Sequence, residues 1–229
     1  MLCLNLFESL KKIDIYYGVT FNIYDISLII LASIISGLGL LYNSTSTILG
    51  SMLISSIANP LIASSIYLIL NYYSKSIYKI SNFFILVAIC LFIALSIGYT
   101  NKVLKIFETP TKEMLSRITY THVVVDVILA LISGIALALS ILNTDVIIRT
   151  GVSLILSVTP PLVNFGIFYG EILYHYLQLK KETNKFEKNT INKKIEKLSL
   201  DGNKSFILFM LNIIAMYTTL LLTLTILCR

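Results

Sequence analysis

A stretch of 40 residues with a proline break occurs twice in this chain, and it constrains the fold more than any other feature. Residues 25–64 align with residues 126–165 when the sequence is shifted by 101 positions without a gap. Apart from leucines and isoleucines, which match by composition alone, the shift superimposes Asp25 on Asp126, Gly50 on Gly151, Ser56 on Ser157 and Pro60 on Pro161. Repeated apolar segments with a proline break are typical of duplicated membrane units, so the sequence predicts two homologous halves.

The proportion of apolar residues indicates a membrane protein. Of the 229 residues, 56% are hydrophobic and 13% are charged, and this leaves too little polar surface to cover a water-soluble globule. Apolar runs long enough to cross a hydrocarbon core of about 30 Å lie near residues 25–42, 82–100, 122–142 and 205–227. Because helices satisfy their own backbone hydrogen bonds in lipid, we expect an all-α, multi-pass integral membrane protein.

Charge and cysteine patterns argue against several other classes of protein. The formal charge of +6 comes from lysines in loops rather than from a basic groove interleaved with aromatic residues, so we expect no nucleic-acid partner. Cys3, Cys90 and Cys228 lie singly in apolar sequence and fit neither disulfide nor metal-ligand spacing. No dinucleotide fingerprint, phosphate loop or nucleophile elbow occurs, so we expect no enzyme activity, no cofactor and no metal.

The predicted organisation has six spans in two three-helix repeats, each with a proline-broken second helix. The parts are an N-terminal interfacial segment (1–23), the first membrane repeat (24–100), a polar connection (101–121) and the second membrane repeat (122–229). Eight lysines in the loop 180–204 predict a weakly amphipathic helix that lies on the membrane surface before the last span.

The second segment of each repeat is expected to bend. A straight helix over residues 45–73 would be about 43 Å long, which exceeds the hydrocarbon core. Pro60 removes a backbone donor, and Asn59 before it is disfavoured in helical geometry. Residues 145–179 are interrupted in the same way at Thr159, Pro160 and Pro161. Each break is compatible with one bent crossing or with two half-helices that return to the same side.

These two geometries predict different membrane topologies. Single crossings give three spans per half and therefore inverted repeats, and the lysine-bearing segments 102–117 and 180–204 then share one side. The positive-inside rule makes that side cytoplasmic and places both termini outside. Re-entrant hairpins give parallel repeats and divide the lysines more evenly between the two sides. We favour the inverted arrangement.

Several motifs resemble a known prokaryotic membrane family. They are GLGLLYNS at 37–44, Gly50-Ser-Met-Leu-Ile-Ser, Asn59-Pro60, Asp126 with Ala130 and Gly134, and Val158-Thr-Pro-Pro-Leu. In this order they look like the uncharacterised hydrophobic domain family listed as domain of unknown function 389, over about residues 24–175. Thr45 and Ser56 depart from the prolines that the family tends to have. The resemblance implies a multi-span helical membrane protein and supplies no established activity.

Polar residues flank both breaks and form a candidate path for a solute. If the breaks meet near the midplane, freed carbonyls and neighbouring side chains would coordinate a cation or a small polar solute. The alternative is a pair of proline kinks whose polar side chains bond locally to the backbone. The candidate path residues are Ser55, Ser56, Asn59, Pro60, Ser157, Thr159, Pro160, Pro161 and Asn164.

Three smaller sets of residues are candidates for a relay, a metal site and helix packing. His122 and Asp126 form a candidate proton or cation relay, although the match of Asp126 with Asp25 at a helix start favours capping and interface anchoring. Glu171 and His175 share a helix face, but a metal site would need further ligands. Small residues at helical spacing are expected to pack the repeats or subunits together: Ser33, Gly37, Ala130, Gly134 and Ala138.

The predicted function is therefore a channel or transporter for a small solute or ion, with a site at the two broken helices. The competing interpretation is a non-transporting membrane scaffold or assembly protein whose lysine-rich loop binds anionic lipid or a partner. The expected partners are the lipid bilayer, an unidentified solute or ion and, through the small-residue faces, a second copy of the chain.

Overall fold

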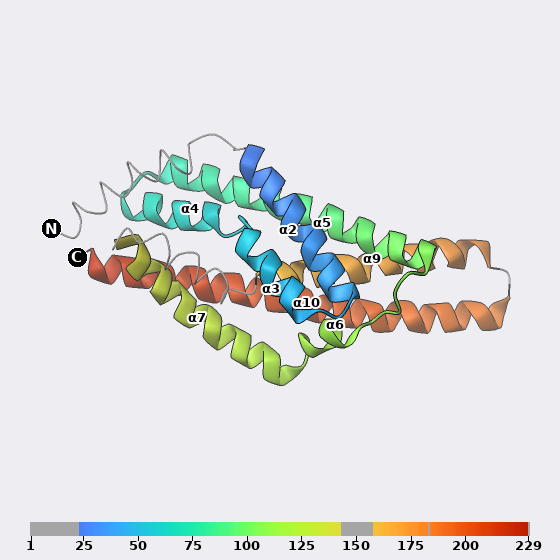
Figure 1. The fold of residues 1–229 in the computed structure, drawn as a ribbon. Coiled ribbons are helices and arrows are strands. Elements are labelled where there is room, and N and C mark those ends of the chain that lie inside the picture. Colours follow the sequence, from blue (N-terminus) through green and yellow to red (C-terminus); the bar gives the residue numbers. More distant parts are fainter. Residues whose placement is uncertain (1–22, 143–157, 183, 229) are drawn as a thin grey trace.

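The computed structural model describes residues 23–142, 158–182 and 184–228, and within these ranges it is helical with no strand (Figure 1). The all-α prediction is confirmed for this part of the chain. The described helices are α2 (Ile23–Leu41), α3 (Thr45–Ile54), α4 (Asn59–Ile69), α5 (Tyr73–Leu104), α6 (Lys112–Ser116), α7 (Tyr120–Leu142), α9 (Thr159–Lys181) and α10 (Lys185–Leu227).

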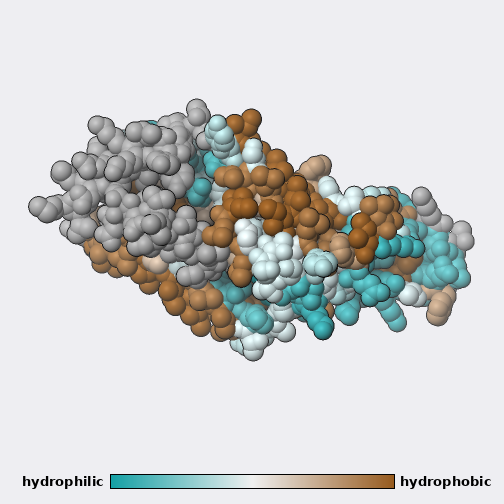
Figure 2. Space-filling view, viewed as in Figure 1, coloured by the Kyte–Doolittle hydropathy of each residue, from teal (hydrophilic) through white to brown (hydrophobic). Residues whose placement is uncertain are grey.

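Three long helices form the centre of the molecule. Helix α9 packs against both α5 and α10, and α4 packs against the same two helices. The remaining long helices lie outside this group: α2 packs on α5, α9 and α3, whereas α7 packs on α10 (Figure 1). One end of the molecule, formed by the end of α9 and the start of α10, projects beyond the other helices and is largely hydrophilic (Figure 2).

Four described helices are long and apolar enough to cross a membrane: α2, α5, α7 and α10. A fifth crossing is counted if α3 and α4, which are bent by 42° at their junction, form one span. At most 39% of the most apolar window of each helix is buried, so most of these apolar side chains face outward, where lipid would cover them. The structure thus agrees with a membrane-embedded protein.

The break in the first repeat lies slightly earlier than expected. Residues 55–58 separate α3 from α4, and Asn59 and Pro60 are the first residues of α4 instead of lying in the break. Proline suits this position because the first turn of a helix needs no backbone donor. Pro160 and Pro161 begin α9 in the same way, directly after Thr159.

The third helix begins earlier than the apolar pattern predicted. We expected a helix near residues 82–100, whereas α5 runs from Tyr73 to Leu104, 32 residues or about 48 Å. One face of its additional turns packs inward: Ser76 is buried and donates a hydrogen bond to the carbonyl of Ser64. The turn before α5 needs only residues 70–72, with Asn71 in the left-handed region at φ 62°.

The lysine-rich segment is not a separate surface helix. Residues 185–204 continue without interruption into the last span, so α10 is a single helix of 43 residues, about 64 Å long. Among the apolar residues of this segment, Leu198 is buried, whereas Phe186 is 79% exposed. Gly202 lies inside this helix and does not break it. An added Cβ there would lie 3.2 Å from Phe168, so glycine permits close packing of α10 against α9.

Several expectations fall outside the described residues. The N-terminal interfacial helix was expected within residues 1–23, of which only residue 23 is described. The first part of the second broken segment, residues 143–157, also lies outside, and Ser157 lies within it.

The small residues singled out in the sequence lie at helix contacts. A Cβ at Gly37 would lie 2.8 Å from Ile97 on α5, and a Cβ at Gly134 would lie 2.5 Å from the Met216 carbonyl on α10. The other three, Ser33, Ala130 and Ala138, are buried.

The close approach of α5 to α9 involves glycines that were not singled out. Gly98 on α5 faces α9, where an added Cβ would lie 2.2 Å from the Ile167 carbonyl oxygen. Gly166 and Gly170 on α9 face α5, and their added Cβ atoms would lie 2.4 Å from Ala94 and 2.2 Å from the Leu95 carbonyl oxygen. This four-residue spacing of glycines lets the α5 and α9 backbones touch.

Candidate functional site

The two proline-broken segments meet in the structure. Ser55, in the break between α3 and α4, lies with its hydroxyl 2.6 Å from the hydroxyl of Thr159, the first residue of α9. Either hydroxyl can donate this hydrogen bond. Thr159 and both prolines that follow it, Pro160 and Pro161, are buried. We call this contact, with the residues bonded around it, the junction.

On one side of the junction lies a group of polar residues around Asp25. The Ser56 hydroxyl donates to the Asp25 backbone carbonyl at 3.0 Å, and the Asn59 side chain hydrogen-bonds the Asp25 carboxylate. Lys79, on α5, interacts electrostatically with that carboxylate and is only 4% exposed. The start of α2 is thereby connected to the first break through the Asp25 backbone carbonyl and to both the break and α5 through the Asp25 carboxylate.

On the other side, Asn164 ties α9 to two further elements. Its side-chain nitrogen donates to the Met114 carbonyl on α6 at 3.0 Å and to the Ser205 hydroxyl on α10 at 3.0 Å. Asn164 is fully buried, so its amide bonds hold the α9 start, the α6 turn and α10 in register.

The candidate relay residues lie on α7 and have their own partner. Asp126 interacts electrostatically with Arg117, in the connection before α7, and with His122. Arg117 also forms an ion pair with Glu113, at 3.8 Å. Asp126 is therefore paired with bases beside its own helix start, away from the bonds that form the junction.

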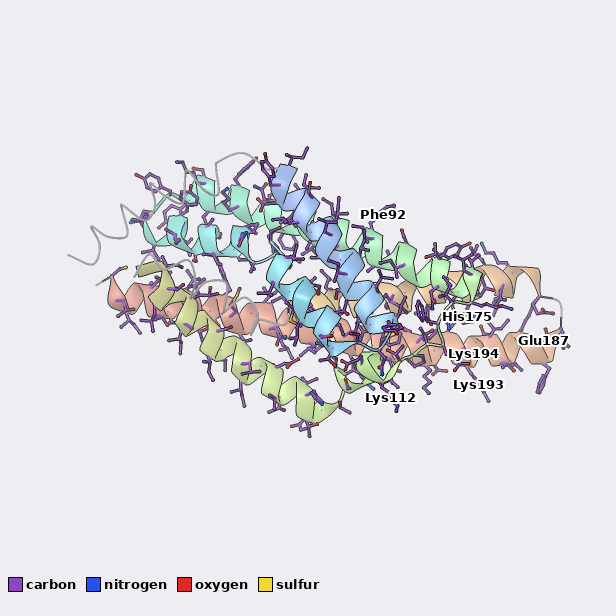
Figure 3. All side chains as sticks on the ribbon, viewed as in Figure 1. Phe92, Lys112, His175, Glu187, Lys193 and Lys194 are labelled. Carbon is purple, nitrogen blue, oxygen red and sulfur yellow. The ribbon has the colours of Figure 1, made fainter. Side chains whose placement is uncertain are left out.

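A second polar region lies at the hydrophilic end of the molecule. A cavity of about 260 Å³ opens between the end of α5, the connection after it, α9 and α10. Its lining combines acidic and basic side chains: Lys102, Thr109, Pro110, Glu171, His175, Lys194, Lys197, Leu198 and Asp201. In Figure 3, His175 on α9 and Lys194 on α10 lie side by side at this end. We call this space the Glu171 cavity.

The central acid of this cavity lies outside the four candidate spans. The Glu171 side chain has no exposed surface, and Lys102 Nζ lies 3.3 Å from its Oε2. Within the described residues, neither carboxylate oxygen accepts a well-oriented hydrogen bond, and the same is true of the buried Thr109 hydroxyl. Burial raises the pKa of the Glu171 carboxyl above its usual value, while Thr109 and Lys102 oppose the rise.

The bases of the cavity are arranged around this acid. Burial lowers the pKa of His175 below its usual value, and the charges of Lys102 and Lys194 lower it further. The Gln178 side chain, whose Oε1 lies 3.3 Å from His175 Nδ1, opposes this lowering of the pKa. Asp201 is paired with Lys204 at 3.4 Å, while the exposed Lys194 and Lys197 lie one helical turn apart on α10.

Comparison with known families identifies the chain. Residues 52–218 match the family described as Domain of unknown function (DUF389). The chain belongs to the DUF389 family. The resemblance inferred from its motifs is thereby confirmed, and the matched range includes the junction and the Glu171 cavity. No curated protein and no solved structure matches the chain.

Sequence reasoning found the junction residues of this DUF389 protein but missed two of the groups around them. Lys79 was passed over because it precedes the apolar run that marked the third span, although a lysine within a helix of this length is itself a signal. Glu171 and His175 were considered only as metal ligands. Their cavity is completed by Lys102 and Lys194, which lie far away in sequence and carry no shared motif.

Proposed function

We propose that this DUF389 protein is a conduit for a small solute or ion, and that its path runs past the junction of the two broken helices. The observation that carries the proposal is the 2.6 Å contact between Ser55 and Thr159, because it joins the two breaks inside the bundle. Helix ends at membrane depth are tolerated where protein or water covers them, and such ends form the solute sites of repeat-built transporters.

Our proposal takes α3 and α4 as one bent crossing instead of a re-entrant hairpin. At a bend of 42° α4 continues onward from α3, whereas a hairpin would reverse the direction of the chain. The start of α3 lies beside α6, since the Thr45 hydroxyl donates to Glu113 at 2.6 Å. The end of α4 lies elsewhere, because Asn71 lines the same surface hollow as Cys228 at the end of α10.

The distance between these two levels fits a bilayer. Asn164 bonds both Met114 on α6 and Ser205 on α10, which places α6 level with Ser205. From Ser205 to Cys228 the last helix rises about 35 Å, close to the hydrocarbon thickness. The bent pair therefore begins and ends near opposite faces of a membrane of that thickness, which supports the inverted, six-span reading of the chain.

The packing of the two halves supports a duplicated architecture as well. In the first half α2 and α4 both pack on α5, and in the second half α7 and α9 both pack on α10. Proline is the second residue of both helices that follow the breaks, Pro60 in α4 and Pro160 in α9, although the shift of 101 positions pairs Pro60 with Pro161. In this proposal the second broken segment, of which the structure describes the part in α9, counts as a crossing between α7 and α10 that ends near the level of Asn164 and Ser205.

Charge orients the proposed conduit. Lys102, Lys194 and Lys197 line one cavity, so the connection after α5 and the hairpin between α9 and α10 lie at the same end of the bundle. The positive-inside rule makes that end cytoplasmic.

Flux measurements test the proposal. The full chain is reconstituted in liposomes, and uptake of monovalent cations, anions, water and small metabolites is followed. We expect flux of one of these, reduced by Asn59→Leu and by Thr159→Val, because each removes a polar group from the junction. Lys193→Gln, on the exposed surface of α10, is the matched control. Absence of flux for every solute, or flux indifferent to both junction variants, would overturn the proposal.

The competing function, a membrane scaffold, is favoured by one observation: the α9–α10 hairpin projects beyond the other helices (Figure 1). Lysines such as the half-buried Lys188 and the exposed Lys193 would bind acidic partners there. A cellular phenotype that follows Lys188→Glu with Lys193→Glu and ignores Asn59→Leu favours the scaffold. The opposite pattern favours the conduit.

A further inference from the structure

The Glu171 cavity holds charges that the proposed conduit does not use. It lies at the hydrophilic end, beyond the level of the junction, and its space of about 260 Å³ is enough for a small solute with several waters. Its deepest charged group, Glu171, is fully buried yet accepts no well-oriented hydrogen bond from the described residues. Lys102 Nζ lies 3.3 Å from one carboxylate oxygen, Oε2, whereas the other, Oε1, has no hydrogen-bond partner among the described residues. An unsatisfied buried oxygen is costly, so a ligand that donates a hydrogen bond to Oε1 would be favoured here.

The same cavity also offers positive charge to a ligand. Lys102 extends from α5, and Lys194 and Lys197 extend from successive turns of α10. Lys102 is paired with Glu171 and Asp201 with Lys204, so these charges largely offset one another. Lys194 and Lys197 remain to hold an anion, and the His175 ring lies in the same lining as a further hydrogen-bonding group.

We propose that the Glu171 cavity binds a small oxyanion that retains a proton, with hydrogen phosphate as the simplest member of this class. The negative oxygens of the ligand face Lys194 and Lys197, and its remaining hydroxyl donates to the Glu171 carboxylate. A carboxylate accepts a hydrogen bond from a protonated oxyanion and repels a fully ionised one of the same size. The pair Glu171 and Lys102 therefore selects for the proton on the ligand, whereas the α10 lysines supply affinity.

Phosphate and sulfate test this selection, because they have nearly the same shape but only phosphate keeps a hydroxyl at neutral pH. Binding to the full chain in nanodiscs of zwitterionic lipid is followed by calorimetry and by thermal stabilisation at matched ionic strength. We expect phosphate to bind at least about tenfold more tightly than sulfate, the effect of one charge-assisted hydrogen bond. Equal binding of the two anions, or no binding of phosphate, overturns the proposal.

Variants assign the two roles separately. Glu171→Gln should bring the affinities for phosphate and sulfate together, because the amide can donate to an ionised oxygen. Lys194→Gln with Lys197→Gln should weaken both anions, whereas Lys193→Gln, which lies outside the cavity lining, should not. A loss in Lys193→Gln as large as in the double variant would indicate diffuse attraction to the helix surface and overturn the site. A folded-state spectrum accompanies each variant, and the phosphate preference of the unmodified chain stands as a test without any of them.

A lipid headgroup is the other source of phosphate chemistry at this end of the molecule. At about pH 8 a phosphomonoester lipid has lost its second proton and cannot donate to Glu171, while inorganic phosphate still can. Phosphatidic acid in the nanodisc should therefore leave phosphate binding unchanged at that pH. Competition by phosphatidic acid at about pH 8 would show that lysines alone hold a headgroup, and the proposal would fail. None of these measurements involves flux, so the site and the conduit succeed or fail separately.

Discussion

The junction and the Glu171 cavity are two polar regions of one bundle, and they differ in how their polar groups are satisfied. At the junction, Ser55 and Thr159 bond to each other, and Ser56 bonds to a backbone carbonyl. In the cavity, Glu171 is equally buried but accepts no well-oriented hydrogen bond. Groups that satisfy one another hold helices together without retaining a ligand, whereas an unsatisfied acid gains from one. The junction therefore suits a path along which a solute moves without being retained, and the Glu171 cavity suits a site that binds a ligand.

Helix α9 contributes residues to both regions. The largest loss of stability is expected when α9 is displaced from α5. Gly98→Leu would force α5 and α9 apart, because even a Cβ lies 2.2 Å from the Ile167 carbonyl oxygen. We expect a loss of at least about 3 kcal/mol in stability, measured by thermal unfolding in detergent. Gly50→Ala is the control, since no atom lies within 4 Å of its added Cβ. Equal behaviour of the two variants would show that the close approach is absent.

The next largest effect is expected where the junction is held in register. Asn164→Leu removes both amide hydrogen bonds and leaves the Met114 carbonyl and the Ser205 hydroxyl without this donor. We expect a stability loss of about 1–3 kcal/mol in the same unfolding assay. Asn203→Leu is the comparison, because Asn203 bonds the Tyr169 hydroxyl on the exposed surface. A smaller loss for Asn164 than for Asn203 would contradict the role of the Asn164 side-chain nitrogen in holding the junction together.

A smaller effect is expected for the hydroxyl pair at the centre of the junction. Ser55→Ala and Thr159→Val each remove one partner of a 2.6 Å bond, so their effects should not add. A double-mutant cycle should give a coupling of about 0.6 kcal/mol, the typical value for polar pairs between membrane helices. Additive losses in unfolding free energy would show that the two breaks do not touch in the membrane.

The smallest effect on stability is expected for Glu171→Gln in the cavity, and this variant should raise stability where the others lower it. Because the folded-state pKa of Glu171 lies above the ordinary value of 4.5, its ionised form is disfavoured by folding. The stability that this carboxyl contributes is present below pH 4.5 and is lost as the pH rises through the folded-state pKa. Glu171→Gln should remove that loss and raise the melting temperature at about pH 8 relative to the unmodified chain.

The control for this pH dependence is Glu196→Gln, at an exposed position of α10. It should leave the curve of melting temperature against pH unchanged. An equal response of the two variants would mean that burial of Glu171 does not govern the titration, and the contrast between cavity and junction would then disappear.

Much of the fold follows from apolar periodicity and proline placement in the sequence. The starts of α2 and α7 were expected to within two residues, because long apolar runs are the strongest signal in a membrane chain. The start of α5 and the continuity of α10 were not, because polar turns such as those around Ser76 and Leu198 are stabilised by neighbours distant in sequence. Hydropathy reports which residues tolerate lipid, and it does not report where a helix ends.

The site was only partly predictable for a related reason. Proline and its polar neighbours mark the breaks locally, so Ser55 and Thr159 could be named from sequence. Lys79 and Glu171 acquire their roles from charges on other helices, Asp25 in one case and Lys102 in the other. A single sequence does not contain those pairings, and the three-dimensional packing of α5 against α2 and α9 creates them.

The unbroken course of α10 has a mechanical consequence. One stiff rod, from Lys185 to Leu227, joins the tip of the projecting hairpin to the far face of the proposed bilayer. Because α10 has no break, a tilt of its N-terminal end also tilts its C-terminal end. A protein bound to the hairpin would therefore tilt the helix against which α7 and α9 pack. A ligand bound at Lys194 would therefore contact the same helix against which α7 and α9 pack.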